Sequence, residues 1–209
     1  MALVRSRFDA FGGAERFVQS AIAALSAQGA TLTLVTRRWP DNDGTAIILD
    51  RPRHENLVRQ VREAGARIKF ITDGDVAGAV LAARGGADIL LGTGGAPEAV
   101  VAACALRCIG GAMQCRLWPR DDNDRKLAVE RGLDVTRVLA IDDLVSSDDV
   151  FFAASGITTG DLLKGVEYVA GGATSESLVM RARSGTIRRI QTEHHWRKLE
   201  QISGTRYTN

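Results

Sequence analysis

Short apolar runs alternate with amphipathic stretches along the first two thirds of the chain. Runs rich in Val, Ile and Leu predict strands, and apolar residues that recur every three to four positions predict helices. The predicted strands are Ala2–Arg5, Thr31–Thr36, Ala46–Leu49, Arg67–Thr72, Ala87–Leu91 and Val138–Ile141. The predicted helices are Ala14–Gln28, His54–Ala64, Asp75–Arg84, Pro97–Arg107 and Asp122–Gly132. This alternation is typical of an α/β fold with layered elements.

Beyond residue 149 the strand patterns follow one another without an intervening helix. The predicted strands are Val150–Ala154, Val166–Ala170, Ser175–Arg183 and Thr186–Gln191, which indicates an antiparallel region. From Arg181 onward the chain carries seven Lys and Arg residues against two Glu. We interpret this tail as a solvated edge hairpin whose charges oppose aggregation. An arm that binds phosphate or nucleic acid is the alternative interpretation.

The composition limits the classes of protein and of partner. The chain has 209 residues, enough for one or two domains. Hydrophobic residues make up 45% and charged residues 25%, which excludes a disordered chain. The net charge is +2, so charge alone gives no argument for nucleic acid or a membrane surface. No apolar run is long enough to cross a bilayer. We therefore expect no nucleic-acid partner and no membrane partner.

The cysteines and the N-terminus bear on the compartment. Cys104, Cys108 and Cys115 are odd in number, and no His or further Cys lies nearby to complete a metal site. We interpret them as small buried hydrophobic residues in a reducing compartment, with a metal pair at Cys104 and Cys108 as the alternative. The first residues lack the apolar segment of a signal peptide. We therefore expect a cytoplasmic protein.

Candidate chemistry begins directly after the predicted strand Ala46–Leu49. Arg51 and Arg53 flank Pro52, which fixes its own backbone and extends the residue before it. Both guanidinium groups could then meet one anion, because their planar forks match phosphate oxygens. A helix-entry loop with solvated charges explains the same residues. His54 is expected to begin the following helix rather than to act as a base.

Two more candidate segments follow predicted strands in the same way. In Asp73-Gly74-Asp75, Asp75 can N-cap the next helix, and Asp73 can accept from sugar hydroxyls or approach a metal. In the stretch Gly92–Glu98, glycines permit close backbone approach, and the helix start favours an anion. Ligands bind at the carboxyl ends of strands in open α/β sheets. The three segments together predict a pocket for a phosphorylated, hydroxyl-rich molecule and a metal. The pair Asp142-Asp143 is a fourth candidate.

Several motifs resemble the C-terminal half of the class II fructose-1,6-bisphosphatases over about residues 45–203. They are LDRPRH (49–54), ARIKFITDGDVA (66–77), GTGGAPE (92–98), CIGGAMQCRLWPRDD (108–122), DDLVSSDDVFFAASGITTGDLLKGV (142–166) and TIRRIQTEHHWRKL (186–199). Because these motifs occur in order, the resemblance is specific. It implies the C-terminal part of a layered αβαβα sugar-phosphatase fold, usually in a homo-oligomer.

The resemblance also implies an activity and a set of site residues. The activity would be hydrolysis of the 1-phosphate of fructose 1,6-bisphosphate with Mn²⁺ or Mg²⁺, in gluconeogenesis or growth on glycerol. By the same resemblance, Glu98 would be a metal ligand. The residues that would contact the substrate are Arg51, Pro52, Arg53, Asp73, Gly74, Asp75 and Gly95.

The first forty residues resemble a different family. LVRSRFDAFGGAERFV (3–18) and TLVTRRW (33–39) are similar to the start of a family 4 glycosyltransferase of the GT-B type, where the Gly12-Gly13 loop would approach a nucleotide-sugar. This predicts a Rossmann-like β-α-β fragment. The expected domains are therefore a glycosyltransferase-like fragment over 1–41 and the phosphatase region over 42–209.

Three functions remain open at this point. The first is a metal-dependent fructose-1,6-bisphosphatase. The second is a non-catalytic fragment that binds sugar phosphates, because the family's N-terminal half supplies most of the metal-binding carboxylates and is not matched here. The third is a glycosyltransferase fragment. Metal titration distinguishes the first two, since tight Mn²⁺ binding is expected only of the phosphatase.

Overall fold

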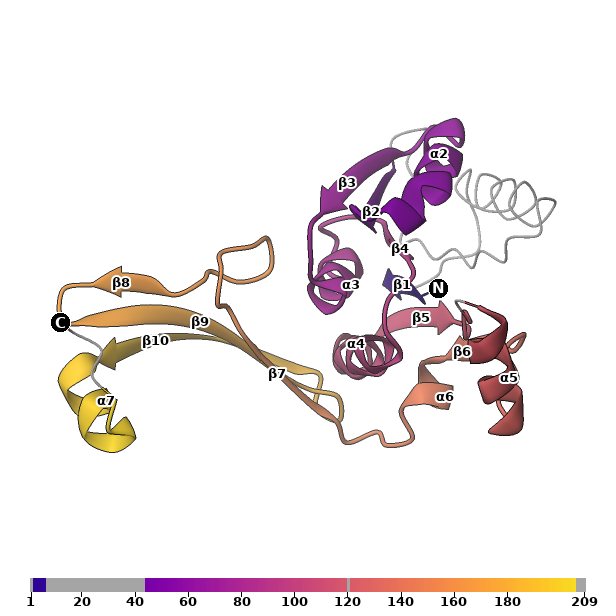
Figure 1. The fold of residues 1–209 in the computed structure, drawn as a ribbon. Coiled ribbons are helices and arrows are strands. Elements are labelled where there is room, and N and C mark those ends of the chain that lie inside the picture. The colour runs from indigo at the N-terminus through magenta and orange to yellow at the C-terminus, as the bar shows by residue number, and fades with distance from the viewer. Residues whose placement is uncertain (1, 7–43, 120, 206–209) are drawn as a thin grey trace.

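The computed structural model describes residues 2–6, 44–119 and 121–205, and their strands form two sheets (Figure 1). The strand order of the first sheet is β3-β2-β4-β1-β5-β6. In the second sheet the order is β10-β9-β7, with β8 paired to β9. The predicted helix Ala14–Gln28, the predicted strand Thr31–Thr36 and the Gly12-Gly13 loop lie outside the described residues. The predicted Rossmann-like fragment is thus not confirmed.

The parallel part of the first sheet carries the candidate loops. It consists of β2 (Thr45–Leu49), β3 (Arg67–Ile71) and β4 (Ile89–Gly92). Strand β2 lies in the middle and pairs in parallel with both neighbours. The connecting helices are α2 (Glu55–Glu63), which follows the short 3-10 helix η1 (Pro52–His54), and α3 (Asp75–Ala83). The apolar patterns thus predicted these strands and helices correctly.

The remaining strands of this sheet are antiparallel to their neighbours. Strand β1 (Ala2–Ser6) lies between β4 and β5 (Gly111–Cys115), and β5 also pairs with β6 (Leu139–Ala140). The sequence pattern did not predict β5, because its Gly-Ala-rich residues lack the β-branched side chains that indicate a strand. Strand β1 joins the same sheet as residues 45–140, although it was expected in a separate fragment.

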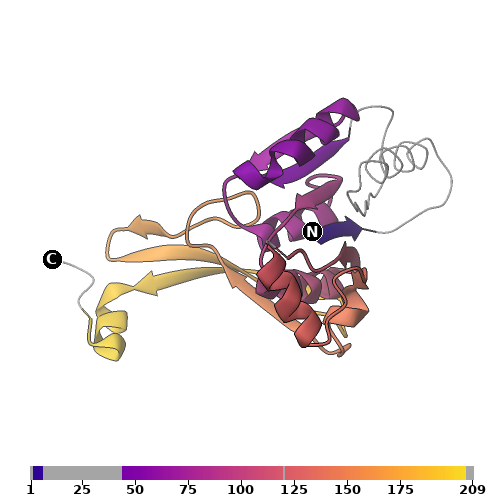
Figure 2. The ribbon, with the colours of Figure 1, turned by 45° about the vertical axis from the view of Figure 1, so that its right-hand side comes forward.

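The second sheet is built around a long hairpin. Its strands are β7 (Phe151–Ser155), β8 (Glu167–Val169), β9 (Gly172–Arg181) and β10 (Thr186–His195). The hairpin of β9 and β10 extends away from the first sheet, and its far end carries helix α7 (Trp196–Ser203) (Figures 1 and 2). The predicted charged edge hairpin is confirmed, since β10 is an exposed edge strand. Helix α7 was not predicted.

Helices α3 and α4 (Ala96–Ile109) form a layer between the two sheets. One side of this layer packs on the first sheet through Leu90, Ala103 and Leu106. The other side packs on the second sheet, where Cys108 meets Leu178 and Met180. Helix α2 covers the opposite face of the first sheet through Val61 and its neighbours. Within the described residues the layers therefore run helix, sheet, helix, sheet, which confirms the expected mixed α/β class.

The other helices are short, and the cysteines are buried as expected. Helix α5 (Asp122–Glu130) and helix α6 (Ile141–Leu144) flank strand β6. Cys108 and Cys115 are buried, Cys104 is half-buried, and all three are free thiols. Burial raises the pKa of the Cys108 and Cys115 thiols above their ordinary value. In the described part of the chain, no helix combines the length and apolar character needed to cross a membrane.

Strand β10 predicts self-association through its outer edge. It offers ten residues of edge backbone with Ile190 41% exposed, and such edges pair with other chains. We expect Ile190→Lys to weaken association, because a charge on an edge strand opposes further pairing. Sedimentation velocity over a concentration series measures the change. Val129→Lys, at a 63% exposed position of α5, is the matched control. A wild-type chain that sediments as a monomer at every concentration would contradict the prediction.

Candidate functional site

The three candidate loops lie together at one edge of the first sheet. Because β2, β3 and β4 are parallel and adjacent, their carboxyl ends meet at the same edge. The backbone N–H of Asp50 donates to the carbonyl of Ile71 at 2.9 Å and ties the loop after β2 to the end of β3. The sequence prediction that these loops share an edge is therefore confirmed.

The loop after β2 sends Arg53 toward the loop after β4. The Nε of Arg53 donates to the carbonyl oxygen of Thr93 at 2.9 Å. Arg51 has a different contact, because its Nη1 donates to the carbonyl of the adjacent Asp50 at 3.2 Å. Pro52 begins η1, as its fixed backbone angle favours. Of the two predicted anion-binding arginines, Arg53 is thus the one whose hydrogen bond reaches the glycine loop.

His54 is buried behind these loops. Its Nδ1 lies 2.8 Å from the carbonyl oxygen of Leu49, and its Nε2 accepts the N–H of Thr93 at 2.9 Å. The ring precedes α2, so the predicted helix-start position is confirmed. Gly92 leaves room for the ring, because a Cβ there would lie 3.2 Å from Cε1 of His54.

The loop after β3 turns sharply at Gly74. Gly74 has a φ of 93°, which L side chains rarely adopt, and it occupies the N-cap position of α3. Asp73 is exposed, and its Oδ1 accepts the N–H of Gly74 at 2.9 Å. The predicted capping role of Asp75 is wrong: Asp75 is the first helical residue and caps no N–H with its side chain. The reason is that the left-handed glycine takes the cap position itself.

The loop after β4 brings a second carboxylate to the site. Helix α4 begins at Ala96 with Pro97 in its first turn, as predicted. Glu98 lies in the same turn and folds back over Gly95, where a Cβ would overlap its carboxylate. A Cβ on Gly94 would lie 2.9 Å from Oδ2 of Asp75. The carboxylates of Asp75 and Glu98 therefore lie directly against Gly94 and Gly95.

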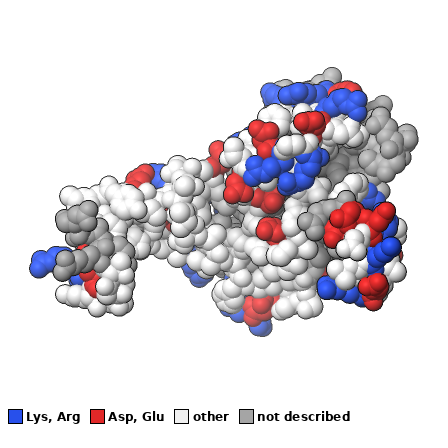
Figure 3. Space-filling model, in the orientation of Figure 1, with Lys and Arg blue, Asp and Glu red and all other residues white. Residues whose placement is uncertain are grey.

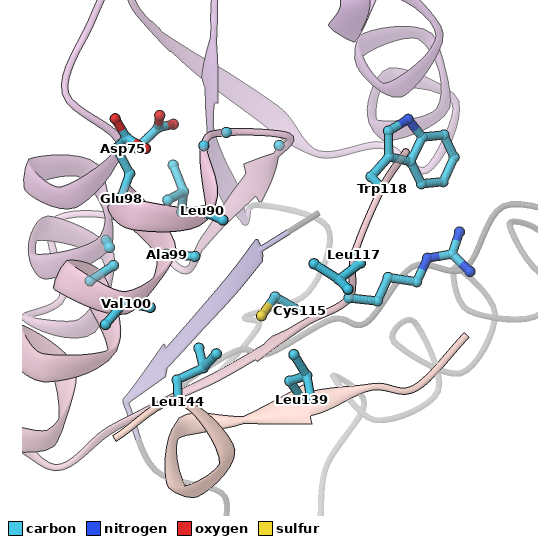
Figure 4. A pocket seen from close by; sticks show the side chains of 17 residues that line it. Asp75, Leu90, Glu98, Ala99, Val100, Cys115, Leu117, Trp118, Leu139 and Leu144 are labelled. Carbon is cyan, nitrogen blue, oxygen red and sulfur yellow. The ribbon is translucent and has the colours of Figure 1, made fainter. Parts of the chain in front are cut away.

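Asp75 and Glu98 point toward one another at the mouth of this site (Figure 4). Burial raises the pKa of Asp75 above its ordinary value, and the negative charges of Glu98 and Asp73 raise it further. The positive charge of Arg53 acts in the opposite direction. Acidic and basic side chains lie side by side on the surface around α3 and β4 (Figure 3). The site thus combines adjacent carboxylates with a nearby guanidinium.

A cavity of about 230 Å³ extends from the two carboxylates into the space between α4 and strands β5 and β6. Its inner wall is apolar and includes Leu90, Leu139 and Leu144, while Trp118 lies at its other end (Figure 4). Arg116 also lines the cavity. The guanidinium carbon of Arg116 lies 5.0 Å from the ring centroid of Trp118, a cation–π contact. Arg116 and Trp118 were not among the site residues predicted from the sequence. The only signal was their place directly after Cys115, in a motif quoted for its resemblance.

The carboxylates of the site suit a divalent cation whose other ligands are phosphate oxygens of a substrate and water. Across residues 2–6, 44–119 and 121–205, no three His, Cys, Asp or Glu side chains are arranged to hold a metal by themselves. Asp75 and Glu98 supply two adjacent carboxylates, and Mg²⁺ is commonly held by one or two carboxylates together with substrate phosphate oxygens and water. The residues therefore fit a cation bound with its substrate.

The fourth candidate, Asp142-Asp143, is occupied by structural contacts. Arg107 forms ion pairs with Asp142 and with Asp148. Arg137 pairs with Asp143, whose Oδ2 also accepts the N–H of Ala140 at 2.8 Å. The Arg107–Asp142 pair fastens the segment around α6 to α4. Arg107, Arg137 and Ala140, which bind these two carboxylates, all lie outside the loops after β2, β3 and β4.

Comparison with known proteins identifies similar sequences. A family model described as bacterial fructose-1,6-bisphosphatase, glpX-encoded, matches residues 23–194. The class 2 fructose-1,6-bisphosphatase of Haemophilus influenzae is 42% identical over 176 residues, 77% of this chain and 53% of that protein. Two Synechococcus proteins named D-fructose 1,6-bisphosphatase class 2/sedoheptulose 1,7-bisphosphatase are each 43% identical over 168 residues, 73% of this chain and 48% of theirs.

The chain spans about half the length of these curated relatives. The comparisons do not support the predicted likeness of residues 1–40 to a glycosyltransferase. The family match begins at residue 23, inside that stretch.

The left-handed backbone at Gly74 predicts that a methyl group added there destabilises the fold. We expect Gly74→Ala to lower the free energy of unfolding by roughly 1–2 kcal/mol, because alanine is strained at a left-handed φ. Urea denaturation followed by circular dichroism measures the difference. Gly160→Ala is the control, since its Cβ would meet no atom within 4 Å and its φ is not left-handed. Equal stabilities of the two variants would contradict this assignment.

The raised pKa of Asp75 predicts a pH dependence of stability. The folded chain keeps the Asp75 proton to a higher pH than the unfolded chain, whose value is near 3.8. The free energy of unfolding should therefore fall as the pH rises through the range just above that value. In Asp75→Asn this loss should be absent. Urea midpoints measured from acid to neutral pH provide the test, with Asp122→Asn at an exposed position of α5 as the control. Parallel pH profiles of wild type and Asp75→Asn would contradict it.

Proposed function

The chain belongs to the bacterial, glpX-encoded fructose-1,6-bisphosphatase family, and from this premise we propose that it binds a sugar bisphosphate at the carboxyl edge of β2, β3 and β4. The proposed reaction is metal-dependent hydrolysis of the 1-phosphate of fructose 1,6-bisphosphate. The observation that carries the proposal is the meeting of Arg53, the glycine loop at the start of α4, and the carboxylates of Asp75 and Glu98.

The phosphate is proposed to bind between Arg53 and the first turn of α4. The first backbone N–H groups of a helix have no partner inside the helix, and they attract an anion. Gly94 and Gly95 are exposed, so an anion can approach this backbone closely. Arg53 is exposed and held against Thr93, which places its positive charge beside the same loop. Arg51, Pro52 and Gly95 are proposed to complete the substrate contacts.

The sugar is proposed to lie over the loop after β3. Asp73 is exposed and Asp75 is half-buried beside it, and both carboxylates can accept hydrogen bonds from hydroxyl groups. The backbone turn at Gly74 fixes the two carboxylates relative to each other. Recognition of hydroxyls by carboxylates favours a polyol over a plain phosphate ester. This accounts for a substrate that is both phosphorylated and hydroxyl-rich.

A divalent cation, Mn²⁺ or Mg²⁺, is proposed to be held by Glu98 with Asp75 beside it. When bound, such a cation offsets carboxylate charge, polarises a phosphoryl oxygen and lowers the pKa of water. The carboxylate of Glu98 lies over Gly95, where it would repel a phosphate at the helix start. Burial raises the pKa of Asp75 and the charge of Glu98 raises it further, so the pair gains from a positive charge placed between them.

The proposed hydrolysis breaks the bond between phosphorus and the oxygen of C1. A water oxygen attacks phosphorus, the C1 oxygen leaves and takes up a proton, and the products are inorganic phosphate and the sugar monophosphate. Arg53 would stabilise the negative charge on the transferring phosphoryl oxygens. The names of the Synechococcus relatives include a seven-carbon bisphosphate, so we propose that both sugars are candidate substrates. A place in gluconeogenesis or glycerol metabolism, a cytoplasmic location and a homo-oligomer belong to the same proposal.

A non-catalytic sugar-phosphate-binding protein is the second candidate function. The observation in its favour is that the described residues include no group of three or more metal-binding side chains. The phosphate-binding side of the site needs Arg53 and the start of α4, and neither depends on further carboxylates. Binding without hydrolysis would then be the whole function of this chain.

Phosphate release from fructose 1,6-bisphosphate in the presence of Mn²⁺ tests the proposal. We expect release to require the metal and to fall roughly a hundredfold or more in Glu98→Gln, since loss of a charge that organises the reacting group has this scale. Glu130→Gln, on the exposed surface of α5, is the control and should keep full activity.

The outcomes separate the two candidate functions. Metal-dependent release that is lost in Glu98→Gln and kept in Glu130→Gln supports the phosphatase. A folded chain that binds fructose 1,6-bisphosphate in calorimetry but releases no phosphate supports the binding protein and contradicts the proposed reaction. A folded chain that neither binds nor hydrolyses the sugar bisphosphate contradicts both.

A further inference from the structure

His54 is buried behind the loops of the candidate site, and its pattern in the sequence predicted only that it begins a helix. Its side chain is 2% exposed, and in the part of the chain that the structure describes it is the one buried polar or charged residue. Burying an imidazole is costly unless both ring nitrogens are hydrogen-bonded. The ring of His54 meets this condition with two backbone partners.

The two partners fix which ring nitrogen carries the hydrogen. The N–H of Thr93 can only donate, so Nε2, 2.9 Å away, must be the acceptor. The carbonyl of Leu49 can only accept, so Nδ1, 2.8 Å away, must carry the hydrogen. The ring is therefore the neutral Nδ1–H tautomer. In this form it joins the last residue of β2 to the first residue after β4.

Thr93 is held at both of its backbone groups by two consecutive residues. His54 accepts from its N–H, and Arg53 donates to its carbonyl oxygen. Thr93 directly precedes Gly94 and Gly95, which have no side chains to hold their backbone. The loop therefore depends on Thr93 for its position. The same pair of contacts keeps the guanidinium of Arg53 next to the loop.

We infer that His54 is a positioning residue that aligns the glycine loop and the Arg53 guanidinium on one bound phosphate. This inference rests on the proposed function for the identity of the ligand. His54 itself is too deeply buried to touch the substrate, and its Nε2 lone pair is already used by Thr93. Its effect is therefore exerted through the backbone of Thr93 and not through proton transfer.

Nuclear magnetic resonance of the full chain tests the geometry without reference to catalysis. The ¹⁵N shifts of the His54 ring should show a protonated Nδ1 and an unprotonated Nε2. The amide of Thr93 should exchange slowly with solvent, and exchange should accelerate at least tenfold in His54→Phe, which keeps a buried ring and removes both hydrogen bonds. An Nε2-protonated ring, or unchanged Thr93 exchange in a folded His54→Phe, would overturn the inference.

Binding of inorganic phosphate then tests the consequence for the site. We expect His54→Phe to bind phosphate about tenfold more weakly than wild type, as followed at the Gly94 and Gly95 amides. His54→Gln, whose amide keeps one donor and one acceptor, should recover part of the affinity. A purely structural role would weaken stability in both variants and leave the phosphate affinity of the folded fraction unchanged, which would overturn the inference.

The two proposals fail in different ways. If the wild-type chain binds phosphate more tightly than His54→Phe but hydrolyses no sugar bisphosphate, the positioning role is supported and the phosphatase activity is contradicted. If wild type and His54→Phe hydrolyse fructose 1,6-bisphosphate with the same KM and kcat, the phosphatase activity is supported and the positioning role is overturned. A wild-type chain that binds no phosphate overturns the ligand on which this inference rests.

Discussion

The parallel pairing of β2 with both β3 and β4 is the constraint on which the candidate site depends. Parallel neighbours end at the same edge of a sheet, so three loops that are distant in sequence are delivered to one place. The helices that follow also start there, which directs their unpaired N–H groups toward the same point. Had β4 run antiparallel to β2, the glycine loop would lie at the opposite edge from Arg53. Arg53 and the glycine loop could then not contact the same ligand.

The site concentrates charges of both signs in a small area. Burial raises the pKa of Asp75, the negative charges of Glu98 and Asp73 raise it further, and the positive charge of Arg53 opposes them. Adjacent carboxylates that are not neutralised within the fold are typical of places that receive a cation. The glycines that support them are equally specific, because any side chain at Gly94 or Gly95 would meet a carboxylate. Gly94 and Gly95 therefore allow close packing of the carboxylates but leave the loop backbone flexible. The hydrogen bonds of Arg53 and His54 to Thr93 hold that backbone in place.

The sequence predicted the parallel strands, their helices and the three loops, because these features are local. Val, Ile and Leu runs such as Ala46–Leu49 are recognisable without knowing their neighbours. What it missed depends on distant contacts. Strand β5 is rich in glycine and alanine and becomes a strand by pairing with β1 and β6. The capping role expected of Asp75 was displaced by the left-handed turn at Gly74. Arg116 and Trp118 reach the cavity only because β5 ends beside α4.

The location of β1 has a consequence for how this chain acquires its structure. Residues 2–6 lie between β4 and β5, and Ala2 is opposite both Gly92 and Cys115. Strand β1 therefore occupies the middle of a sheet whose flanking strands are made about ninety and a hundred and ten residues later, a separation that slows folding. Strands β4 and β5 run in the same direction and meet only through β1. During synthesis β1 has no partner strand until β4 is made, so it depends on protection from premature pairing.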